Sequence, residues 1–321
     1  LQIFSAEKRE AVVNLRPLLA QICETWSLST AEKSLLTPNG FPLEFAFATN
    51  SEDICVTAEI GNSAWSHFEK RQFIDSICND SDIWNDALMK ELINQTNQRF
   101  GLWLSIRQAD FSRRFKIYQE VTNHSAKEFL AKLRFQIGGD WKDEMLDPRL
   151  YGIVPQNNEI KEFYCKIIQP DFQILHKLFA AAGKAKMLPF VVNYLAFLAD
   201  EESKKLLKRL RLGVSFQISP NDSPELTLFA HSAQLFSDNL KARKKILEIA
   251  RQFDVEMRFY ERASSQINES FPAELVHGMI GIKIKESEFD CIIGVEPFSV
   301  KSNESANRRA VSARTKSISA A

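Results

Sequence analysis

Several residue patterns that would identify a protein class are missing from the 321-residue sequence. The five cysteines form no CxxC pair and are odd in number, so neither a disulfide framework nor a zinc site is indicated. No apolar run approaches the ~20 residues of a membrane-spanning helix, and the first ten residues contain no signal-peptide core. Free thiols without an export signal predict a cytoplasmic protein that does not insert into membranes.

An excess of charge of either sign is also missing, because 41 Lys and Arg residues balance 41 Asp and Glu residues. A balanced chain has no global field to attract nucleic acid or an anionic membrane surface, so we expect neither as a partner. The nucleotide-binding, serine-hydrolase and magnesium-binding DDxxD motifs are absent, and the five histidines show no metal-ligand spacing. An anionic ligand must therefore be bound by a local cluster of cations.

What is present is a recurring pair of strand patterns, each pair split by a polar or turn-forming segment. The pairs cover residues 41–60, 100–121, 149–168, 211–236 and 274–298. Helical patterns lie between them, at 6–26, 65–98, 125–137, 171–210 and 237–253. We expect 171–210 to be two helices, broken near Gly183 or Pro189. The order predicts a structural repeat without obvious sequence identity.

Five such repeats give about ten antiparallel strands, and a sheet of that length is expected to curl, split or close. We predict an α+β fold in which a closed ten-stranded antiparallel barrel of αββα units carries its helices outside. It forms a single domain over residues 1–298. The polar, basic segment 299–321 has no apolar period and is predicted to be a disordered tail.

Alternation along the strands separates two faces. In the first strand Leu43, Phe45 and Phe47 share one face, whereas Glu44 is on the other with small residues. A barrel would direct the second, polar face into a lumen. This inward set is Glu44, Thr57, Glu59, Trp103, Ser105, Arg107, Arg114, Lys116, Tyr118, Tyr164, Lys166, Arg211, Ser215, Gln217, Thr227, Phe229, His231, His277, Met279 and Lys283.

An open sheet with helices on one face predicts the same alternation, because its polar face would meet water. The aromatic residues of the inward set count against that alternative, since a solvated face rarely needs them. For His231 and His277 a hydrogen-bonded structural role is the expectation.

Cations of the inward set indicate an anionic ligand. The segment RRFKIYQEV places Arg114, Lys116 and Tyr118 on one face of one strand. On a solvated edge this arrangement would have no special meaning. However, further cations on other strands share the inward direction, and a ring of cations around a lumen is costly unless an anion enters it. A diphosphate, bound by Lys, Arg and tyrosine hydroxyls, fits such a ring.

The order of elements from about residue 6 to 298 resembles the aromatic prenyltransferases of the ABBA or PT-barrel type. FPLEFAFATN is similar to the first strand of the indole prenyltransferases, the dimethylallyltryptophan synthase group, and RRFKIYQEV is similar to that group's Arg-x-Lys-x-Tyr strand. The short chain is more similar to the bacterial and cyanobacterial members that act on indole alkaloids of the hapalindole or ambiguine type than to the longer fungal enzymes.

The resemblance implies roles for individual residues. Glu44 would accept the indole N–H as the catalytic residue, and Arg114, Lys116 and Tyr118 would bind the prenyl diphosphate. Strand parity adds four more diphosphate-binding candidates and two aromatic lining candidates: Tyr164, Lys166, Arg211 and Lys283, and Trp103 and Phe229. The family usually has a basic residue on its second strand, where this chain has Cys55, Thr57 and Glu59. We expect the cations across the barrel to keep Glu44 ionised.

The leading hypothesis is an enzyme that transfers a dimethylallyl or geranyl group from its diphosphate to an indole by electrophilic aromatic substitution. No metal is required by such a site, although Mg²⁺ bound to the diphosphate stays open. The alternative is a non-catalytic barrel that binds an anionic hydrophobic ligand, and a third possibility is an open α+β interaction module.

Overall fold

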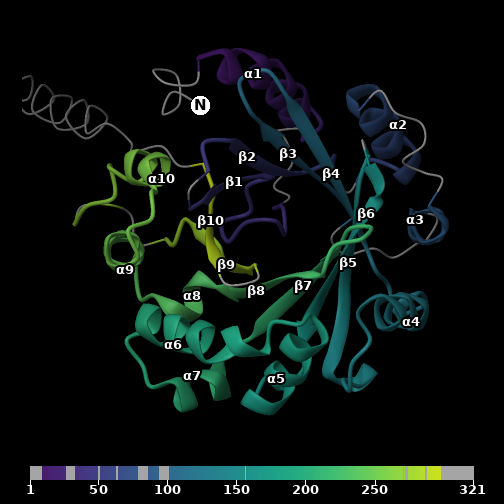
Figure 1. Ribbon diagram of the computed structural model, residues 1–321. Coiled ribbons are helices and arrows are strands. Elements are labelled where there is room, and N and C mark those ends of the chain that lie inside the picture. Colours follow the sequence, from purple (N-terminus) through teal and green to yellow (C-terminus); the bar gives the residue numbers. More distant parts are fainter. Residues whose placement is uncertain are drawn as a thin grey trace, which may run out of the picture.

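The computed structural model describes residues 9–26, 33–49, 51–62, 64–78, 86–93, 101–155, 157–269, 271, 274–285 and 288–297. Within these ranges ten strands form a closed antiparallel barrel with helices arranged outside it (Figure 1). The predicted closed barrel is confirmed, and the alternative of an open sheet is wrong. The segment predicted to be a disordered tail, 299–321, lies outside the described residues.

Every strand pairs with the strands before and after it in the chain, and β1 closes the ring with β10. Closure leaves the sheet without an edge, which removes the main site for unwanted strand pairing. The strands are β1 (Leu43–Ala48), β2 (Ile54–Glu59), β3 (Leu102–Gln108), β4 (Arg113–Glu120), β5 (Leu146–Val154), β6 (Asn157–Ile167), β7 (Leu212–Ile218), β8 (Glu225–His231), β9 (His277–Ile284) and β10 (Phe289–Val295).

The helices follow the predicted ranges with two differences. They are α1 (Arg9–Glu24), α2 (His67–Cys78), α3 (Ala87–Ile93), α4 (Ala126–Ile137), α5 (Phe172–Ala181), α6 (Leu188–Ala199), α7 (Ser203–Arg209), α8 (Ser232–Leu235), α9 (Asn239–Gln252) and α10 (Arg258–Ala263). Residues 171–210 form three α-helices, not two, because Asp200 takes a left-handed conformation (φ 53°) and ends α6. The fourth predicted strand pair ends early, at His231, where α8 begins.

Local sequence explains several helix ends. The side chain of Asp171 accepts a hydrogen bond from the backbone N–H of Ile174, and Asp238 caps α9 in the same way. Gly138 ends α4 with φ 62°, a left-handed value that glycine takes without strain.

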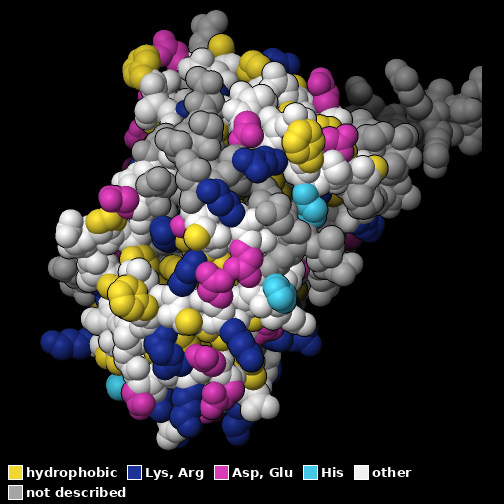
Figure 2. Space-filling view, turned by 90° about the vertical axis from the view of Figure 1, so that its right-hand side faces the viewer, with side chains coloured by type: hydrophobic (Ala, Val, Ile, Leu, Met, Phe, Trp, Pro, Cys, Tyr) yellow, Lys and Arg dark blue, Asp and Glu magenta, His cyan; other side chains and the backbone are white. Residues whose placement is uncertain are grey.

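The outward face of the barrel and the helices enclose the main hydrophobic core. Outward residues such as Leu104, Ile117 and Ile282 are fully buried there. Burial of one such side chain contributes roughly 1.5–3 kcal/mol, so the wall is held from outside and its inner face is free to carry polar groups. On the molecular face in Figure 2, Lys and Arg side chains lie among Asp and Glu side chains, as the balanced composition predicts.

The parity prediction fails at the start of β9. A register shift between Ile293 and Val295 of β10 changes which side of the sheet the opposing residues face. His277 therefore points outward and is fully buried, where its Nε2 lies 2.9 Å from the Tyr260 hydroxyl. Gly278 takes the inward side instead, next to Glu44. The predicted structural role of His277 is confirmed, but its inward placement is wrong.

Among the described helices, none has the length and apolar content needed to cross a membrane.

Candidate active site

The two ends of the barrel differ in their connections, because the five hairpin turns lie at one end and helices connect the strands at the other. We call these the hairpin end and the helix end. Along β4, Arg114, Lys116 and Tyr118 lie successively farther from the hairpin turn. Their partners on β3 follow the same order, from Arg107 to Trp103. The lumen wall thus changes from charged at the hairpin end to aromatic deeper inside.

Five polar side chains from β4, β6, β7, β8 and β9 form one continuous chain across the lumen wall. Lys116 Nζ lies 2.5 Å from Glu162 Oε2 and 2.8 Å from Gln217 Oε1. Gln217 Nε2 donates to Glu225 Oε2 at 2.6 Å, and Lys283 Nζ lies 2.7 Å from the same oxygen. We call these five residues the lumen charge chain.

The inner pair of this chain is charged although it is buried. Burial alone would raise the pKa of Glu162, but the charge of Lys116 and hydrogen bonds from Lys116, Ser215 and Tyr164 outweigh it and hold that pKa below its usual range. Burial would lower the pKa of Lys116, and the charge of Glu162 reverses this and raises it. Both groups are therefore ionised at neutral pH.

A second group of charges lies at the rim of the hairpin end. Arg107 Nε and Arg114 Nη2 lie 3.8 and 3.5 Å from Asp53 Oδ2. The two arginine side chains are 46% and 63% exposed, so this pairing contributes little and the guanidinium groups can turn to another anion. Arg107 also hydrogen-bonds Cys55 of β2.

A cavity of about 800 Å³ opens at this rim. Its walls combine cations (Arg107, Lys283 and Lys285), the carboxylates Glu288 and Asp290, and phenylalanines (Phe190, Phe253 and Phe289). Lys285 Nζ lies 2.9 Å from Asp290 Oδ2. Charged and aromatic walls together suit an amphipathic ligand. The volume is large enough for a small organic molecule.

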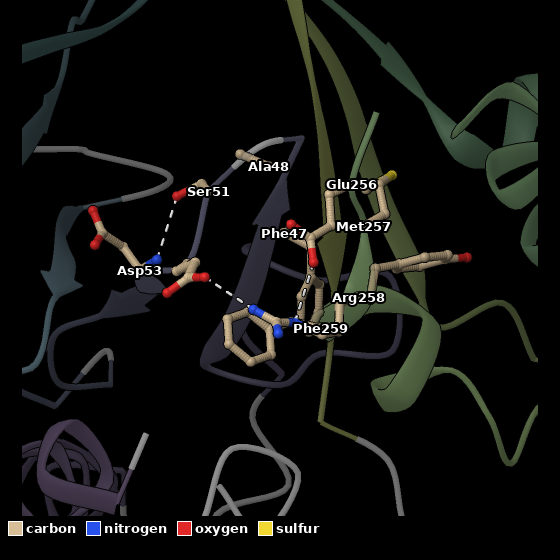
Figure 3. A pocket seen from close by; sticks show the side chains of 10 residues that line it. Phe47, Ala48, Ser51, Asp53, Glu256, Met257, Arg258 and Phe259 are labelled. Carbon is tan, nitrogen blue, oxygen red and sulfur yellow. Dashed lines mark hydrogen bonds and ion pairs between the residues drawn. The ribbon is translucent and has the colours of Figure 1, made fainter. Parts of the chain in front are cut away.

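A smaller cavity, of about 180 Å³, lies against the outer side of the barrel wall (Figure 3). Phe47, which belongs to the outward face of β1, lines it. Arg258 lies between Glu52, at 2.9 Å, and Glu256, at 3.3 Å. The charge of Arg258 in this smaller cavity is thus already paired with carboxylates of the protein. We therefore assign the chemistry to the lumen.

Three aromatic rings from alternate strands line the lumen on the side of the lumen charge chain that faces away from the hairpin end. Tyr118 and Tyr164 meet edge to face with ring centroids 5.3 Å apart, and Tyr164 lies 5.6 Å from Phe229. Burial raises the pKa of both tyrosines, so their hydroxyls are neutral hydrogen-bond donors at physiological pH. Trp103 pairs with Tyr118 on the neighbouring strand.

Glu44 lies near the helix end of β1, and its carboxylate rests on the backbone of two glycines. A Cβ atom at Gly278 on β9 or at Gly294 on β10 would overlap the carboxylate oxygens. The Met279 backbone N–H hydrogen-bonds the carboxylate, whereas Oε1 is buried and has no hydrogen-bond partner among the described residues. The two glycines thus form a cradle that fixes an incompletely satisfied acceptor in the lumen.

Burial raises the pKa of Glu44, the Met279 N–H opposes this shift and the nearby charge of Glu296 adds to it, so that the pKa is about 8. The expectation that cations across the barrel keep Glu44 ionised is therefore wrong. The lysines of the lumen charge chain lie toward the hairpin end and pair with Glu162 and Glu225 instead. In the ligand-free protein Glu44 is mostly neutral at pH 7.

This pKa predicts a pH dependence of stability. The unfolded chain releases the Glu44 proton near pH 4.5, whereas the folded chain keeps it to about pH 8. The stability that this group contributes is therefore fully present below pH 4.5 and decreases as the pH rises to 8, by on the order of 5 kcal/mol in all. We expect Glu44→Gln to be more stable than the parent at pH 8.5 and equal to it near pH 4.5 in urea titrations. The exposed Glu159→Gln serves as the control, and an equal difference at both pH values would contradict the assignment.

A segment at residues 33–42 packs at the helix end beside Glu44. Ser34 Oγ donates to Glu59 Oε2 at 2.5 Å, and the Asn39 backbone N–H donates to Glu296 Oε2 at 3.1 Å. Pro38 lies next to Gly278 of the glycine cradle. The segment is thus attached to the strands on both sides of β1 and supports the position of Glu44.

Two of the predicted cations do not join the lumen charge chain. Lys166 is the second-last residue of β6 and Arg211 immediately precedes β7, so both lie at the helix end, and both are exposed. The structure instead brings together Arg114, Lys116 and Lys283 toward the hairpin end.

The prediction missed the carboxylates Glu162 and Glu225. Each lies two residues from a residue of the inward set, Tyr164 and Thr227 respectively. Strand alternation alone would therefore have placed both carboxylates in the lumen. Alternation does not reveal which inward cations already have a partner.

Known structures with a similar architecture identify the fold. The chain superimposes on 6-dimethylallyltryptophan synthase from Micromonospora olivasterospora with a TM-score of 0.73 at 11% identity, covering 92% of this chain and 96% of that one. It superimposes on 5-dimethylallyl tryptophan synthase from Streptomyces coelicolor with a TM-score of 0.65 at 12% identity, covering 88% and 91%. The chain has the dimethylallyltryptophan synthase fold. The PT barrel implied by the resemblance is thus confirmed.

AnaPT from Neosartorya fischeri shares the dimethylallyltryptophan synthase fold, with a TM-score of 0.61 at 11% identity over 84% of this chain and 82% of that one. No family model and no curated protein sequence matches the chain.

Across the part of the chain that is described, no three His, Cys, Asp or Glu side chains gather as metal ligands would.

Proposed function

We propose that the protein is an aromatic prenyltransferase that moves a dimethylallyl or geranyl group from its diphosphate to an indole acceptor. The observation that carries the proposal is Glu44, a carboxylate held in the lumen with one buried oxygen lacking a partner in the described structure. Two similar structures, the Micromonospora and Streptomyces enzymes, are complexes with DMASPP and Trp. Their ligands match the donor and acceptor classes of the proposal.

The donor diphosphate is assigned to the hairpin end of the lumen. Lys116 and Lys283 would bind it from β4 and β9, and Arg114 would close over it from the rim. The hydroxyls of Tyr118 and Tyr164, 3.4 Å apart, would donate further hydrogen bonds. The prenyl group would extend from there toward the aromatic layer.

The reaction begins when the bond between the prenyl C1 and the diphosphate oxygen breaks and its electron pair leaves with the diphosphate. Cations around the leaving group stabilise the developing negative charge. The aromatic faces of Tyr118, Tyr164 and Phe229 stabilise the allyl cation and exclude water. The indole ring then attacks C1, and loss of a ring proton restores aromaticity.

Glu44 would position the acceptor. An indole N–H that donates to Oε1 supplies the hydrogen bond this oxygen lacks and favours the ionised carboxylate. The negative charge next to the ring nitrogen in turn makes the indole more nucleophilic. Acceptor binding is thus coupled to the release of the Glu44 proton.

The reaction conditions follow from the residues present. We propose that no metal is obligatory, since lysines and arginines can neutralise the diphosphate, and Mg²⁺ bound to the donor is the alternative that an EDTA titration tests. All five cysteines are free thiols, which supports a reducing cytoplasm as the location.

The proposed function is tested by incubating the protein with a matrix of indole acceptors, including tryptophan, and prenyl diphosphates of two lengths. Mass spectrometry should detect a prenylated acceptor together with an equal amount of released diphosphate. Absence of both across the matrix would exclude the activity.

A non-catalytic barrel for an anionic hydrophobic ligand is the second candidate. It is favoured by the pairing of both inner lysines with carboxylates, which leaves little free positive charge to drive ionisation. Such a barrel would bind prenyl diphosphates without turnover, and Glu44→Gln would leave ligand binding unchanged.

Gly294→Ala is expected to raise the KM for the indole acceptor at least tenfold, because its Cβ displaces the Glu44 carboxylate. Donor affinity should change little, since the lumen charge chain lies toward the hairpin end. Gly213→Ala is the matched control, as a Cβ there makes only ordinary contacts, at 3.5 Å or more. An unchanged acceptor KM in folded Gly294→Ala would argue against the cradle.

A further inference from the structure

The lumen charge chain is electrically neutral before any ligand enters. Lys116 and Lys283 each contact one carboxylate, Glu162 and Glu225, at 2.5 and 2.7 Å. Gln217 links the two pairs through both ends of its amide group. A site that binds a diphosphate therefore already contains two anions at the positions where phosphate oxygens would bind.

These ion pairs lie inside the lumen. The side chains of Lys116 and Glu162 are 22% and 7% exposed, and those of Lys283 and Glu225 are 27% and 35% exposed. The Lys116–Glu162 pair is poorly screened at this depth, whereas Lys283 and Glu225 are partly exposed and better screened, so a diphosphate added beside both carboxylates would be repelled most strongly by Glu162. The carboxylates must give up the lysines when the diphosphate binds.

We propose that Glu162 and Glu225 are placeholder anions, which a diphosphate displaces from Lys116 and Lys283 and which expel the diphosphate again after reaction. They would keep the empty lumen neutral and weaken its retention of the leaving group. The inference rests on the proposed function for the identity of the ligand as a prenyl diphosphate.

The displaced carboxylates keep other hydrogen-bond donors, which makes the exchange feasible. Glu162 Oε1 accepts from Ser215 Oγ at 2.7 Å, a donor that the diphosphate does not use. Glu225 keeps the Gln217 Nε2 donor at 2.6 Å. Neither carboxylate would be left without a partner when its lysine turns away.

One diphosphate can engage both lysines at once. The path between their ammonium nitrogens runs through contacts of 2.8, 2.6 and 2.7 Å and one amide group, which places them at most roughly 10 Å apart. The two phosphate groups of a diphosphate, each accepting one ammonium hydrogen bond, span a similar distance. The two displacements should therefore contribute together to the binding of one ligand.

The test is calorimetric titration of the folded protein with inorganic pyrophosphate. We expect Glu162→Gln and Glu225→Gln each to bind pyrophosphate at least tenfold more tightly than the parent, because a competing anion has been removed. The affinity of the double variant for pyrophosphate should rise by about the product of the two single-variant increases. Inorganic phosphate reaches only one lysine, so its affinity for the double variant should rise by no more than one of these increases.

Glu52→Gln removes the same charge outside the lumen, where Glu52 pairs with Arg258, and should leave pyrophosphate affinity unchanged. Weaker or unchanged binding in folded Glu225→Gln, whose side chain is partly exposed, overturns the inference even if Glu162→Gln fails to fold. So does equal tightening in Glu52→Gln, or a lack of pyrophosphate binding by all variants. These binding measurements do not depend on turnover. A product assay that finds no prenylated acceptor would therefore contradict the proposed function without deciding whether the carboxylates are placeholders.

Discussion

Glu44→Gln is expected to lower turnover of an indole acceptor about 100-fold while the fold is retained. In the proposed complex the indole N–H donates to an ionised Oε1, and a hydrogen bond to a charged acceptor contributes roughly 1.5–3 kcal/mol. Each 1.4 kcal/mol lost from the transition state lowers the rate tenfold. Glutamine preserves the shape of the side chain in the Gly278 and Gly294 cradle and removes only its charge. Steady-state kinetics with saturating donor measure the effect.

The exposed Glu159→Gln should leave turnover within twofold of the parent, and the melting temperature of Glu44→Gln at pH 7 should not fall. Retention of more than half of the parent turnover would remove Glu44 from the mechanism. Pyrophosphate affinity should be the same in Glu44→Gln as in the parent, since the lumen charge chain is separate from the cradle.

Lys116→Ala is expected to destabilise the protein by about 3 kcal/mol and to abolish measurable pyrophosphate binding. Without Lys116 the Glu162 carboxylate, 7% exposed, stays buried without its counter-ion, and such a loss typically costs 3–5 kcal/mol. Urea denaturation at pH 7 measures the stability. The difference should shrink at low pH, because Lys116 holds the pKa of Glu162 below its usual range and protonation of Glu162 removes the unpaired charge.

Lys116→Ala/Glu162→Gln provides the matched comparison. It should recover most of the lost stability, since no buried charge is left unpaired, but should not recover pyrophosphate binding. A double variant as unstable as Lys116→Ala would mean that the loss comes from packing and not from charge.

The fold could be predicted from the sequence because each strand pair alternates cleanly and the pairs recur at a similar pace. Polar residues such as Lys116 and Tyr118 on the inner face, opposite apolar residues such as Ile117, specify one register. The prediction failed at His277, where β9 runs three residues from Ile280 to His277 against two from Ile293 to Val295 on β10, and this bulge in β9 itself reverses the side that the start of the strand faces. Bulges depend on pairing across strands and leave little local signal.

The candidate site could be predicted only in part. Glu44, Lys116 and Tyr118 were found because their neighbours in the chain are distinctive. The pairing of Lys116 with Glu162 and Gln217 was not, because these residues are distant in sequence and meet only after the four strands β4 to β7 have been placed side by side. The raised pKa of Glu44 follows from the burial of its carboxylate, which is likewise a property of the assembled barrel.

The position of the large cavity at the rim of the hairpin end sets the order of events in the lumen. Glu44 lies at the far end of β1 from this opening, whereas Lys283 lines the opening and Lys116 lies two residues farther from the hairpin turn than Arg114. An acceptor that enters through the rim must pass the lysines before a diphosphate occupies them. The proposed reaction would therefore follow an ordered sequence, in which the acceptor binds before the donor and the prenylated product leaves after the diphosphate. Free diphosphate would compete with the donor for the lysines and would also block the entry of the acceptor.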